Sequence, residues 1–381
     1  MKNSVLLICL FVISFTISCA QDTVNQVDTP EKIPFTAELL IDELQIPWGM
    51  TFLPDNGMLV TEKSGELIHF KDGKKTMISG VPEVYERGQG GFLDITAHPD
   101  YKNNGWIYMT HASKDGEGKG GNTKLIRAKL SGNALTDIEE LYKAVPNTTK
   151  GQHFGSRIVF DKEGYLFFSV GDRGNRDVNP QDISRDGGKI YRLNDDGSIP
   201  EDNPFVDEAN AKKAIYSYGH RNPQGLALNP ETGKVWDNEH GPRGGDEINV
   251  IMPGANYGWP VITYGINYSG TPITDKTEME GMEQPLHYWV PSIAPSGMAF
   301  ISSDNYGDWK GSVLVGSLKF QYLERLEMEG NKVAKREKVM ADIGRVRDVE
   351  EGPDGLIYVA VEGKGIYKLV PNSQNASGSG K

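Results

Sequence analysis

The chain has 381 residues, of which 38% are hydrophobic and 24% are charged, with 45 glycines and a formal net charge of −12. A chain of this length can bury a large core, in one large domain or in two, and its glycine content argues against a helical bundle. The excess of acidic residues excludes nucleic-acid binding as the main function, because such binding depends on basic patches that displace counterions.

Residues 1–18 predict a signal peptide. A positively charged start precedes an apolar run from Val5 to Ile17, and small residues follow it, which is the pattern of a secretory signal. The run is shorter than the about 20 apolar residues that span a bilayer. Cys9 lies in this segment, so the mature chain is expected to keep only Cys19 and to form no internal disulfide.

The sequence around Cys19 leaves the cleavage point open. Thr16-Ile17-Ser18-Cys19 resembles a bacterial lipobox, in which Cys19 becomes the lipidated first residue, and Ser18-Cys19-Ala20 would also serve as an ordinary cleavage site. We expect an exported protein that is either periplasmic or a membrane-anchored lipoprotein, with membrane attachment only through lipidated Cys19. The polar residues 19–34 are expected to form a tether.

Six copies of one pattern fill the rest of the chain. Each copy has two short β runs joined by a turn rich in Pro, Asp and Gly, which is the composition of hairpins, and most copies add a further run. The copies begin at Met50, Ile95, Ile158, Leu226, Met298 and Val349. Three or four strands per copy, at periods of about 45 to 70 residues, predict an all-β fold, a six-bladed β-propeller of four-stranded antiparallel blades.

The repeats predict a single ring-shaped domain over residues 35–371. The strand-like run from Phe35 to Leu44 precedes the first copy and is expected to complete the last blade. Residues 372–381 are small and polar and are expected to form a flexible tail. The six copies therefore favour one domain over two.

Polar segments broken by glycine interrupt the repeats at the predicted strand ends. They cover residues 87–91, 152–157, 171–176, 219–225, 238–249, 256–260, 317–319 and 344–348. In a propeller such loops converge on one face around the central axis, so residues far apart in the chain can line one pocket. We therefore expect the functional site in these loops.

Four cations in these loops allow two interpretations. Arg221, Lys319, Arg345 and Arg347 could together receive a polyanionic small molecule, because arginine offers planar bidentate donors to carboxylates. Arg345 and Arg347 are two residues apart on a predicted strand and would point to the same face. Alternatively, each cation pairs with a nearby Asp or Glu at the surface.

Two further groups suggest chemistry. His153 is a candidate general base, which Asp172 could hold in one tautomer, although a single histidine is often structural. Glu239, Asp246 and Glu247, interleaved with glycines, are suitable hard oxygen ligands for calcium. A solvated acidic turn is the alternative for these three. No histidine pair has zinc-hydrolase spacing, and no Gly-x-Ser-x-Gly elbow is present.

Four ordered segments carry a family resemblance. Residues 219–225, 239–242, 246–249 and 256–260 resemble the soluble dehydrogenases of glucose and aldose sugars that depend on pyrroloquinoline quinone (PQQ). The resemblance covers about residues 35 to 370 and is strongest to the bacterial aldose sugar dehydrogenases. It implies a six-bladed propeller with PQQ flat at the axial mouth and calcium (Ca2+) beside it.

The resemblance also implies residue roles. The implied catalytic residues are His153, Asp172 and Arg221. The implied cofactor contacts are Gln89, His153, Arg221, Asn222, Lys319, Arg345 and Arg347. The implied metal ligands are the carbonyls of Gly241 and Pro242, with Asp246, Glu247 and Tyr257 at further positions.

Two positions depart from the family pattern. Asp177 stands where the family has a substrate-pocket glutamine, and Val290 stands before Pro291 where the family has a tryptophan, with Trp289 one place earlier. These departures concern the sugar pocket rather than the cofactor residues. They leave the sugar preference open.

The leading hypothesis is an exported enzyme that oxidises aldose sugars at the anomeric carbon to lactones. Its electrons would pass to a quinone or cytochrome, and it would act as a monomer or homodimer without a nucleic-acid partner. The alternatives are a calcium-dependent propeller lactonase or other hydrolase, and a noncatalytic ligand-binding propeller at the cell surface. Lys319, Arg345 and Arg347 favour the first hypothesis, because a lactonase needs no receptor for a tricarboxylate.

Overall fold

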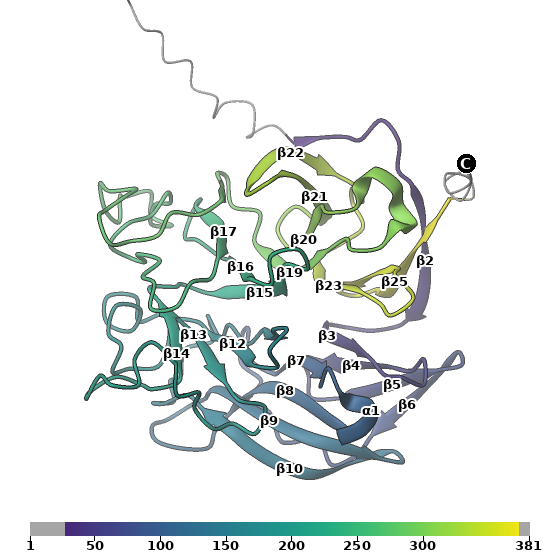
Figure 1. Ribbon diagram of the computed structural model, residues 1–381, viewed down its shortest axis with the longest axis horizontal. Coiled ribbons are helices and arrows are strands. Elements are labelled where there is room, and N and C mark those ends of the chain that lie inside the picture. Colours follow the sequence, from purple (N-terminus) through teal and green to yellow (C-terminus); the bar gives the residue numbers. More distant parts are fainter. Residues whose placement is uncertain (1–26, 373–381) are drawn as a thin grey trace, which may run out of the picture.

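The computed structural model describes residues 27–372 and shows six β-sheets arranged as blades around a central axis (Figure 1). Each blade has four antiparallel strands, which confirms the predicted six-bladed propeller. Helical structure in the described part of the chain is limited to one turn, α1 (Tyr101–Asn104), and a 3-10 segment, η1 (Asp304–Trp309). The six sequence copies therefore correspond to six blades.

The blades follow one another in chain order. Blade 1 contains β3 (Pro47–Phe52), β4 (Met58–Glu62), β5 (Leu67–Lys71) and β6 (Lys74–Ile78). Blade 2 contains β7 (Phe92–Ala97), β8 (Trp106–Ser113), β9 (Asn122–Ser131) and β10 (Ala134–Lys143). Blade 3 contains β11 (Ile158–Phe160), β12 (Leu166–Val170), β13 (Lys189–Leu193) and β14 (Ile215–Tyr218).

Blades 4 to 6 complete the ring. Blade 4 contains β15 (Pro223–Leu228), β16 (Val235–Glu239), β17 (Asp246–Val250) and β18 (His287–Trp289). Blade 5 contains β19 (Pro295–Phe300), β20 (Val313–Ser317), β21 (Tyr322–Glu329) and β22 (Lys332–Lys338). Blade 6 contains β23 (Val346–Glu351), β24 (Ile357–Val361), β25 (Gly365–Pro371) and β2 (Phe35–Asp42).

The last blade closes the ring with strands from both ends of the described chain. Strand β2 pairs antiparallel with β25, with Phe35 opposite Pro371 and Asp42 opposite Gly365. This is the closure that the sequence predicts for residues 35–44. A further short strand, β1 (Val27–Asp28), lies within the predicted tether and pairs in parallel with β22. The predicted signal peptide, the rest of the tether up to residue 26, and residues 373–381 lie outside the described residues.

The hairpin turns form where the sequence predicts them. In blade 1 the amide of Leu53 donates to the carbonyl of Gly57 over 2.8 Å, and the Asp55 carboxylate accepts the Gly57 amide over 3.0 Å. In blade 6 Gly355 adopts a φ of 69°, which favours glycine. Such turns are local devices, which explains why sequence alone places them.

The first strand of each blade lines the axis. The inner strands β3, β7, β11, β15, β19 and β23 contact their neighbours around the ring. All six residues of β19 are buried, and apolar side chains from facing blades form the core between them. A propeller is thus stabilised by a ring of separate apolar clusters rather than by one central core.

The axis itself is closed by buried charge. The Arg157 guanidinium, 3% exposed, lies 2.8 Å from Asp94 on β7 and 2.6 Å from Asp348 on β23, and its Nε donates to the carbonyl of Gln224 on β15. Because blades 3 and 6 face each other across the ring, this side chain spans the axis. Beyond it, at the far ends of the inner strands, a cavity of about 340 Å3 opens on the opposite face.

Candidate active site

The polar loops that the sequence singles out gather where the inner strands begin. His153 lies in the loop before β11, Arg221 and Asn222 directly precede β15, and Arg345 directly precedes β23. Gln89 lies before β7. Because all inner strands run in the same direction along the axis, their starts meet at one mouth of the ring. The candidate site residues from several blades are therefore brought to one face.

His153 and Asp172 form a close pair at this mouth. The His153 Nδ1 lies 2.6 Å from Asp172 Oδ1, and the Asp172 side chain is 1% exposed. His153 has a φ of 57°, an uncommon left-handed conformation for a residue other than glycine. Gly171 fits against it, since a Cβ at that position would lie 2.5 Å from the His153 carbonyl oxygen. The local backbone is therefore shaped around this histidine.

The protonation of the pair follows from its surroundings. Burial lowers the pKa of His153, against the opposing effect of its hydrogen bond to Asp172, so the imidazole is neutral at neutral pH. Burial would raise the pKa of Asp172, but the hydrogen bond from His153 and neighbouring positive charge outweigh it and hold that pKa below its usual value. An ionised carboxylate only accepts hydrogen bonds, so Nδ1 carries the imidazole proton and Nε2 is the basic nitrogen.

Gln89 and Asn222 flank this pair. The side-chain oxygen of Gln89 accepts the backbone N–H of His153 over 2.7 Å. Asn222 is fully buried, and its side-chain oxygen accepts the Gly155 amide over 3.1 Å. The Asn222 Nδ2 group has no hydrogen-bond partner among the described residues. A buried unpaired donor of this kind marks a place where a ligand acceptor would compensate for lost hydration.

Arg221 connects the pair to blade 4. Its backbone carbonyl accepts the amide of Asp172 over 2.8 Å, and its guanidinium donates to the carbonyl of His240 over 2.9 Å. The Arg221 side chain forms no ion pair with a carboxylate within residues 27–372. Its charge lowers the pKa values of His153 and Asp172, so it favours a neutral base beside an ionised carboxylate.

The remaining cations come from blades 5 and 6. Arg345 Nε lies 2.6 Å from a Glu362 carboxylate oxygen, and Arg347 pairs with the other oxygen of the same carboxylate. For these two arginines the predicted alternative, pairing with a nearby carboxylate, is realised. Lys319 is exposed, lies over the Phe320 ring at 5.0 Å, and has no ion pair in the described part of the chain. We call Lys319, Arg345 and Arg347 the basic group.

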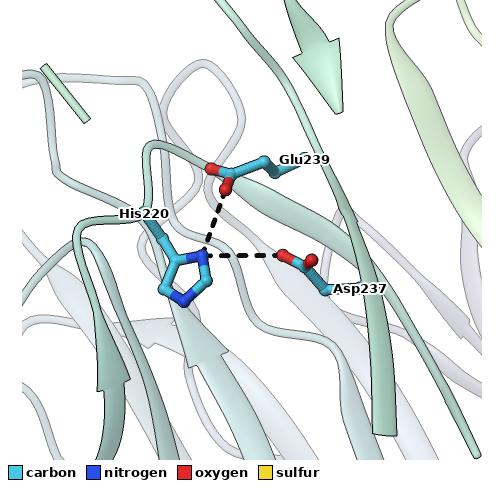
Figure 2. A group of neighbouring side chains, drawn as sticks. All are labelled: His220, Asp237 and Glu239. Atoms are coloured by element: carbon cyan, nitrogen blue, oxygen red, sulfur yellow. Dashed lines mark hydrogen bonds and ion pairs between the residues drawn. The ribbon is translucent and has the colours of Figure 1, made fainter. Parts of the chain in front are cut away.

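Blade 4 contributes a buried acidic cluster. Figure 2 shows His220, Asp237 and Glu239, in which the His220 Nδ1 lies 3.0 Å from Glu239 Oε1 and 3.7 Å from Asp237 Oδ2. Glu247 lies directly opposite Glu239 on the neighbouring strand. We call Asp237, Glu239 and Glu247 the acidic group.

The acidic group is short of positive partners. No lysine or arginine forms an ion pair with it among the described residues, and both carboxylate oxygens of Asp237 are buried without a hydrogen bond. Burial, followed by the charge of Glu239, raises the pKa values of Asp237 and Glu247 well above normal. These carboxyls therefore hold their protons tightly when no cation is bound, and a bound cation would favour their ionised form.

The predicted metal ligands are divided between two places. Glu247, Gly241 and Tyr257 line a cavity of about 10 Å3 together with Glu239, a volume of about one water-sized sphere. Asp246 is next to Glu247 on β17 and therefore points to the opposite face of the blade. Its two oxygens accept the amides of Gly241 and Ala294, each over 2.8 Å.

Two other predicted ligands have part of their hydrogen-bonding capacity in use. The Pro242 carbonyl accepts the Ser292 hydroxyl over 3.2 Å. The Tyr257 hydroxyl donates to the Val250 carbonyl over 2.6 Å, so this side chain is already satisfied. The alternative of a solvated acidic turn is wrong for Glu239 and Asp246, which are 4% and 1% exposed.

Sequence reasoning missed several residues of this site. Asp237 is one of them: it is two residues before the predicted ligand Glu239 on β16, so strand alternation could have placed it on the same face. Glu362 and His220 reach their partners only through the folding of the blades, and no local signal indicates them.

Within residues 27–372 no helix has the length and apolar character needed to cross a membrane.

Comparisons with known proteins find relatives that match most of the chain. The family model described as glucose/sorbosone dehydrogenase matches residues 44–368. The aldose sugar dehydrogenase YliI of Escherichia coli (strain K12) is 42% identical over 369 residues, which cover 95% of this chain and 96% of that protein.

Two solved structures extend the comparison. The apo form of the soluble aldose sugar dehydrogenase from Escherichia coli has a TM-score of 0.83 at 41% identity and covers 88% of this chain and 99% of that one. The PQQ-bound form of the aldose sugar dehydrogenase from Streptomyces coelicolor has a TM-score of 0.73 at 27% identity and covers 90% and 100%. The likeness thus extends over nearly the whole ring.

Proposed function

The chain belongs to the glucose/sorbosone dehydrogenase family of oxidoreductases, and we propose that it oxidises aldose sugars at the anomeric carbon to lactones, using PQQ and calcium. The observation that carries this proposal is the His153–Asp172 pair at 2.6 Å, which shares one mouth of the ring with the basic group. The PQQ in the Streptomyces coelicolor relative supports the choice of cofactor.

The basic group fits a tricarboxylate quinone. Glu362 uses Nε of Arg345 and one Nη of Arg347, so each guanidinium keeps further N–H groups for a ligand. Lys319 adds a compact positive charge, and the unpaired Nδ2 of Asn222 adds a neutral donor. Arginine and lysine together supply the bidentate and point-charge contacts that carboxylates require.

The acidic group and the neighbouring loop fit calcium. The carbonyls of Gly241 and Pro242 would bind the calcium ion that accompanies the quinone. Asp246 would hold Gly241 in place, because its carboxylate accepts the Gly241 amide. Glu247, with the carboxylates of Asp237 and Glu239, would hold calcium within the blade and relieve their mutual repulsion. Tyr257 would contribute through its backbone, because its hydroxyl is already engaged.

The residues of this chain would divide the chemistry as follows. His153 Nε2 would take the proton of the anomeric hydroxyl, while Asp172 stabilises the imidazolium that forms. Arg221 and Asn222 would contact the bound cofactor beside the base. When bound, the quinone would supply the acceptor for the hydride that leaves the anomeric carbon, and calcium would make the quinone more electrophilic.

Several further expectations belong to this proposal. The two electrons would leave through a quinone or a cytochrome. The protein would work outside the cytoplasm, in the periplasm or anchored through Cys19, as a monomer or homodimer. Asp177 and Val290 would shape the sugar preference, since Val290 is 54% exposed near the loop of Gly244.

The test adds PQQ and calcium to the purified apoprotein and follows dye reduction with glucose, other monosaccharides and disaccharides. We expect sugar-dependent reduction that requires both additions, and a loss of about a hundredfold or more in kcat for His153→Ala. A protein that binds no PQQ, or one that hydrolyses lactones with calcium alone, would contradict the proposal. Full activity of His153→Ala would show that another group is the base.

A further inference from the structure

Trp259 lies beside the base pair and has no role in the proposed chemistry so far. It is 6% exposed, and its indole Nε1–H donates to Asp172 Oδ2 over 2.9 Å. The other carboxylate oxygen, Oδ1, faces His153 Nδ1 at 2.6 Å and also accepts the Gly174 amide over 2.6 Å. Each oxygen of this buried carboxylate therefore has its own donors.

The structure fixes Trp259 from several sides. Its amide donates to the Gly219 carbonyl over 2.8 Å, and its own carbonyl accepts the Gln181 side chain over 2.9 Å. Gln181 and Asn256 exchange two side-chain hydrogen bonds, of 3.0 and 2.8 Å, and so tie this loop to the loop that carries Asp172. The Arg221 guanidinium lies 5.4 Å from the Trp259 ring. An indole held this firmly can define the position of the group to which it donates.

We propose that Trp259 is a positioning residue that acts on the His153 base through Asp172: its indole N–H holds Oδ2 and stabilises the carboxylate charge, while the Gly174 amide keeps Oδ1 directed at His153 Nδ1. This inference rests on the proposed function, in which His153 is the base. The arrangement adds a third member to the His153–Asp172 pair, in the way that an orienting group completes a catalytic dyad.

The sign of the effect follows from the hydrogen bonds. An indole N–H stabilises the negative charge of Asp172 and so weakens the attraction between Asp172 and an imidazolium. Without it, Oδ1 stays anchored by the Gly174 amide, and the carboxylate attracts the imidazolium more strongly. Removing the indole N–H should therefore raise the pKa of His153 and reduce the fraction of free base at a given pH.

Other charges around His153 are unchanged by this substitution. The charged or titratable side chains that act on it are Asp172, Arg173, Arg221 and His240. None of the four hydrogen-bonds to the Trp259 indole except Asp172. Because the Arg221 guanidinium also lies 5.4 Å from the Trp259 ring, a variant that keeps a bicyclic ring and removes only the N–H assigns a change in the pKa of His153 to the Trp259–Asp172 contact.

The experiment measures the pKa of His153 by NMR in the full chain without PQQ, with labelled histidine. The chain has seven histidines, and the spectrum of His153→Gln identifies the resonance. We expect Trp259→Phe to raise the pKa by about half a unit or more. With PQQ and calcium added, the acid limb of kcat/KM should move to higher pH by the same amount, with little change in KM.

Trp289→Phe is the matched control. Trp289 is 1% exposed and its indole also donates to a buried carboxylate, Glu324 Oε1, over 3.2 Å. Trp289→Phe should lower the free energy of unfolding about as much as Trp259→Phe does and leave the pKa of His153 unchanged. If Trp259→Phe does not fold, benzothienylalanine at position 259 removes the N–H and keeps the shape of the ring.

The outcomes separate the two proposals. An unchanged pKa in the Trp259 variants, or an equal shift in Trp289→Phe, would overturn the inference. Because the NMR measurement needs no cofactor, it holds even for a protein that oxidises no sugar. Sugar oxidation with a pKa that does not move would contradict the role of Trp259 alone.

Discussion

The basic group and the acidic group lie on the same face of the ring, yet their charges are balanced in different ways. Arg345 and Arg347 share one carboxylate, Glu362, within their own blade. Among the side chains of residues 27–372, the acidic group has only His220 as an ion-pair partner, with its imidazole 3.0 Å from Glu239, and Glu239 also accepts the backbone amides of Arg221 and Asn222. Arg345 is also 46% exposed, whereas Asp237 is fully buried.

Because of this difference, loss of an anion from the basic group and loss of a cation from the acidic group should affect the protein differently. Arg345 and Arg347 keep a resident counter-ion when no anion is bound, because Glu362 pairs with both, and water also reaches the exposed Arg345. Buried carboxylates without a cation carry the desolvation penalty and their mutual repulsion. We therefore expect calcium to control the stability of the protein and the basic group to control mainly the affinity for PQQ.

The largest effect should come from calcium. At about 100 times its Kd, an ion that binds only the folded state adds about 2.7 kcal/mol to the free energy of unfolding, or about 3 to 4 °C in the midpoint for a chain of this size. Thermal unfolding with EDTA and with calcium measures it. Asp237→Asn should be more stable than the wild type in EDTA and gain less from calcium. Equal midpoints with and without calcium would refute this view of the acidic group.

The next effect concerns the basic group. Arg347→Ala should weaken PQQ binding by about 2 kcal/mol, or about thirtyfold, because a charge-assisted contact is lost. Calcium stabilisation should stay at the wild-type value. Titration of the apoprotein with PQQ, followed by tryptophan fluorescence, measures the affinity. Arg347→Lys keeps the positive charge but loses the planar bidentate donors of the guanidinium, so its PQQ affinity should lie between those of the wild type and Arg347→Ala. An unchanged affinity in both variants would place the quinone elsewhere.

A smaller effect of opposite sign should follow from Glu362→Gln. This change removes the carboxylate that competes with the quinone for Arg345 and Arg347, so PQQ affinity should rise by about threefold, which corresponds to less than about 1 kcal/mol. The free energy of unfolding should fall slightly, because two like charges lose their shared partner. Weaker PQQ binding in this variant would mean that Glu362 orients the arginines instead of competing for them.

The smallest effect is a shift along the pH axis. Because burial lowers the pKa of His153, the acid limb of kcat/KM should lie below the ordinary histidine value of about 6.5. Activity should be retained above this pKa and lost as the pH falls through it, since the base then becomes protonated. Initial rates across the acidic range give the limb. A limb above the ordinary value would contradict the environment described for His153.

The fold could be predicted from the sequence because its signals are local. Turns such as Pro54-Asp55-Asn56-Gly57 mark the hairpins of most blades, and the strand-like run from Phe35 was left over to complete the last blade. The His153–Asp172 contact followed from neighbouring strand ends. The partners Glu362, His220 and Trp259 could not be foreseen, because each contact depends on how separate loops or strands meet in space. Strand alternation, a local rule, would have separated Asp246 from Glu247.

The closure of blade 6 joins strands from the two ends of the propeller. Strand β2 is made before the strands of blades 1 to 5 that follow it, and its partner β25 is the last strand of the described chain. Arg347 and Glu362 belong to this same blade, at the ends of β23 and β24. A chain cleaved before residue 365 lacks strand β25, so blade 6 cannot close the ring beside the basic group. Under the proposed function, we expect such a fragment to bind no quinone and to be inactive.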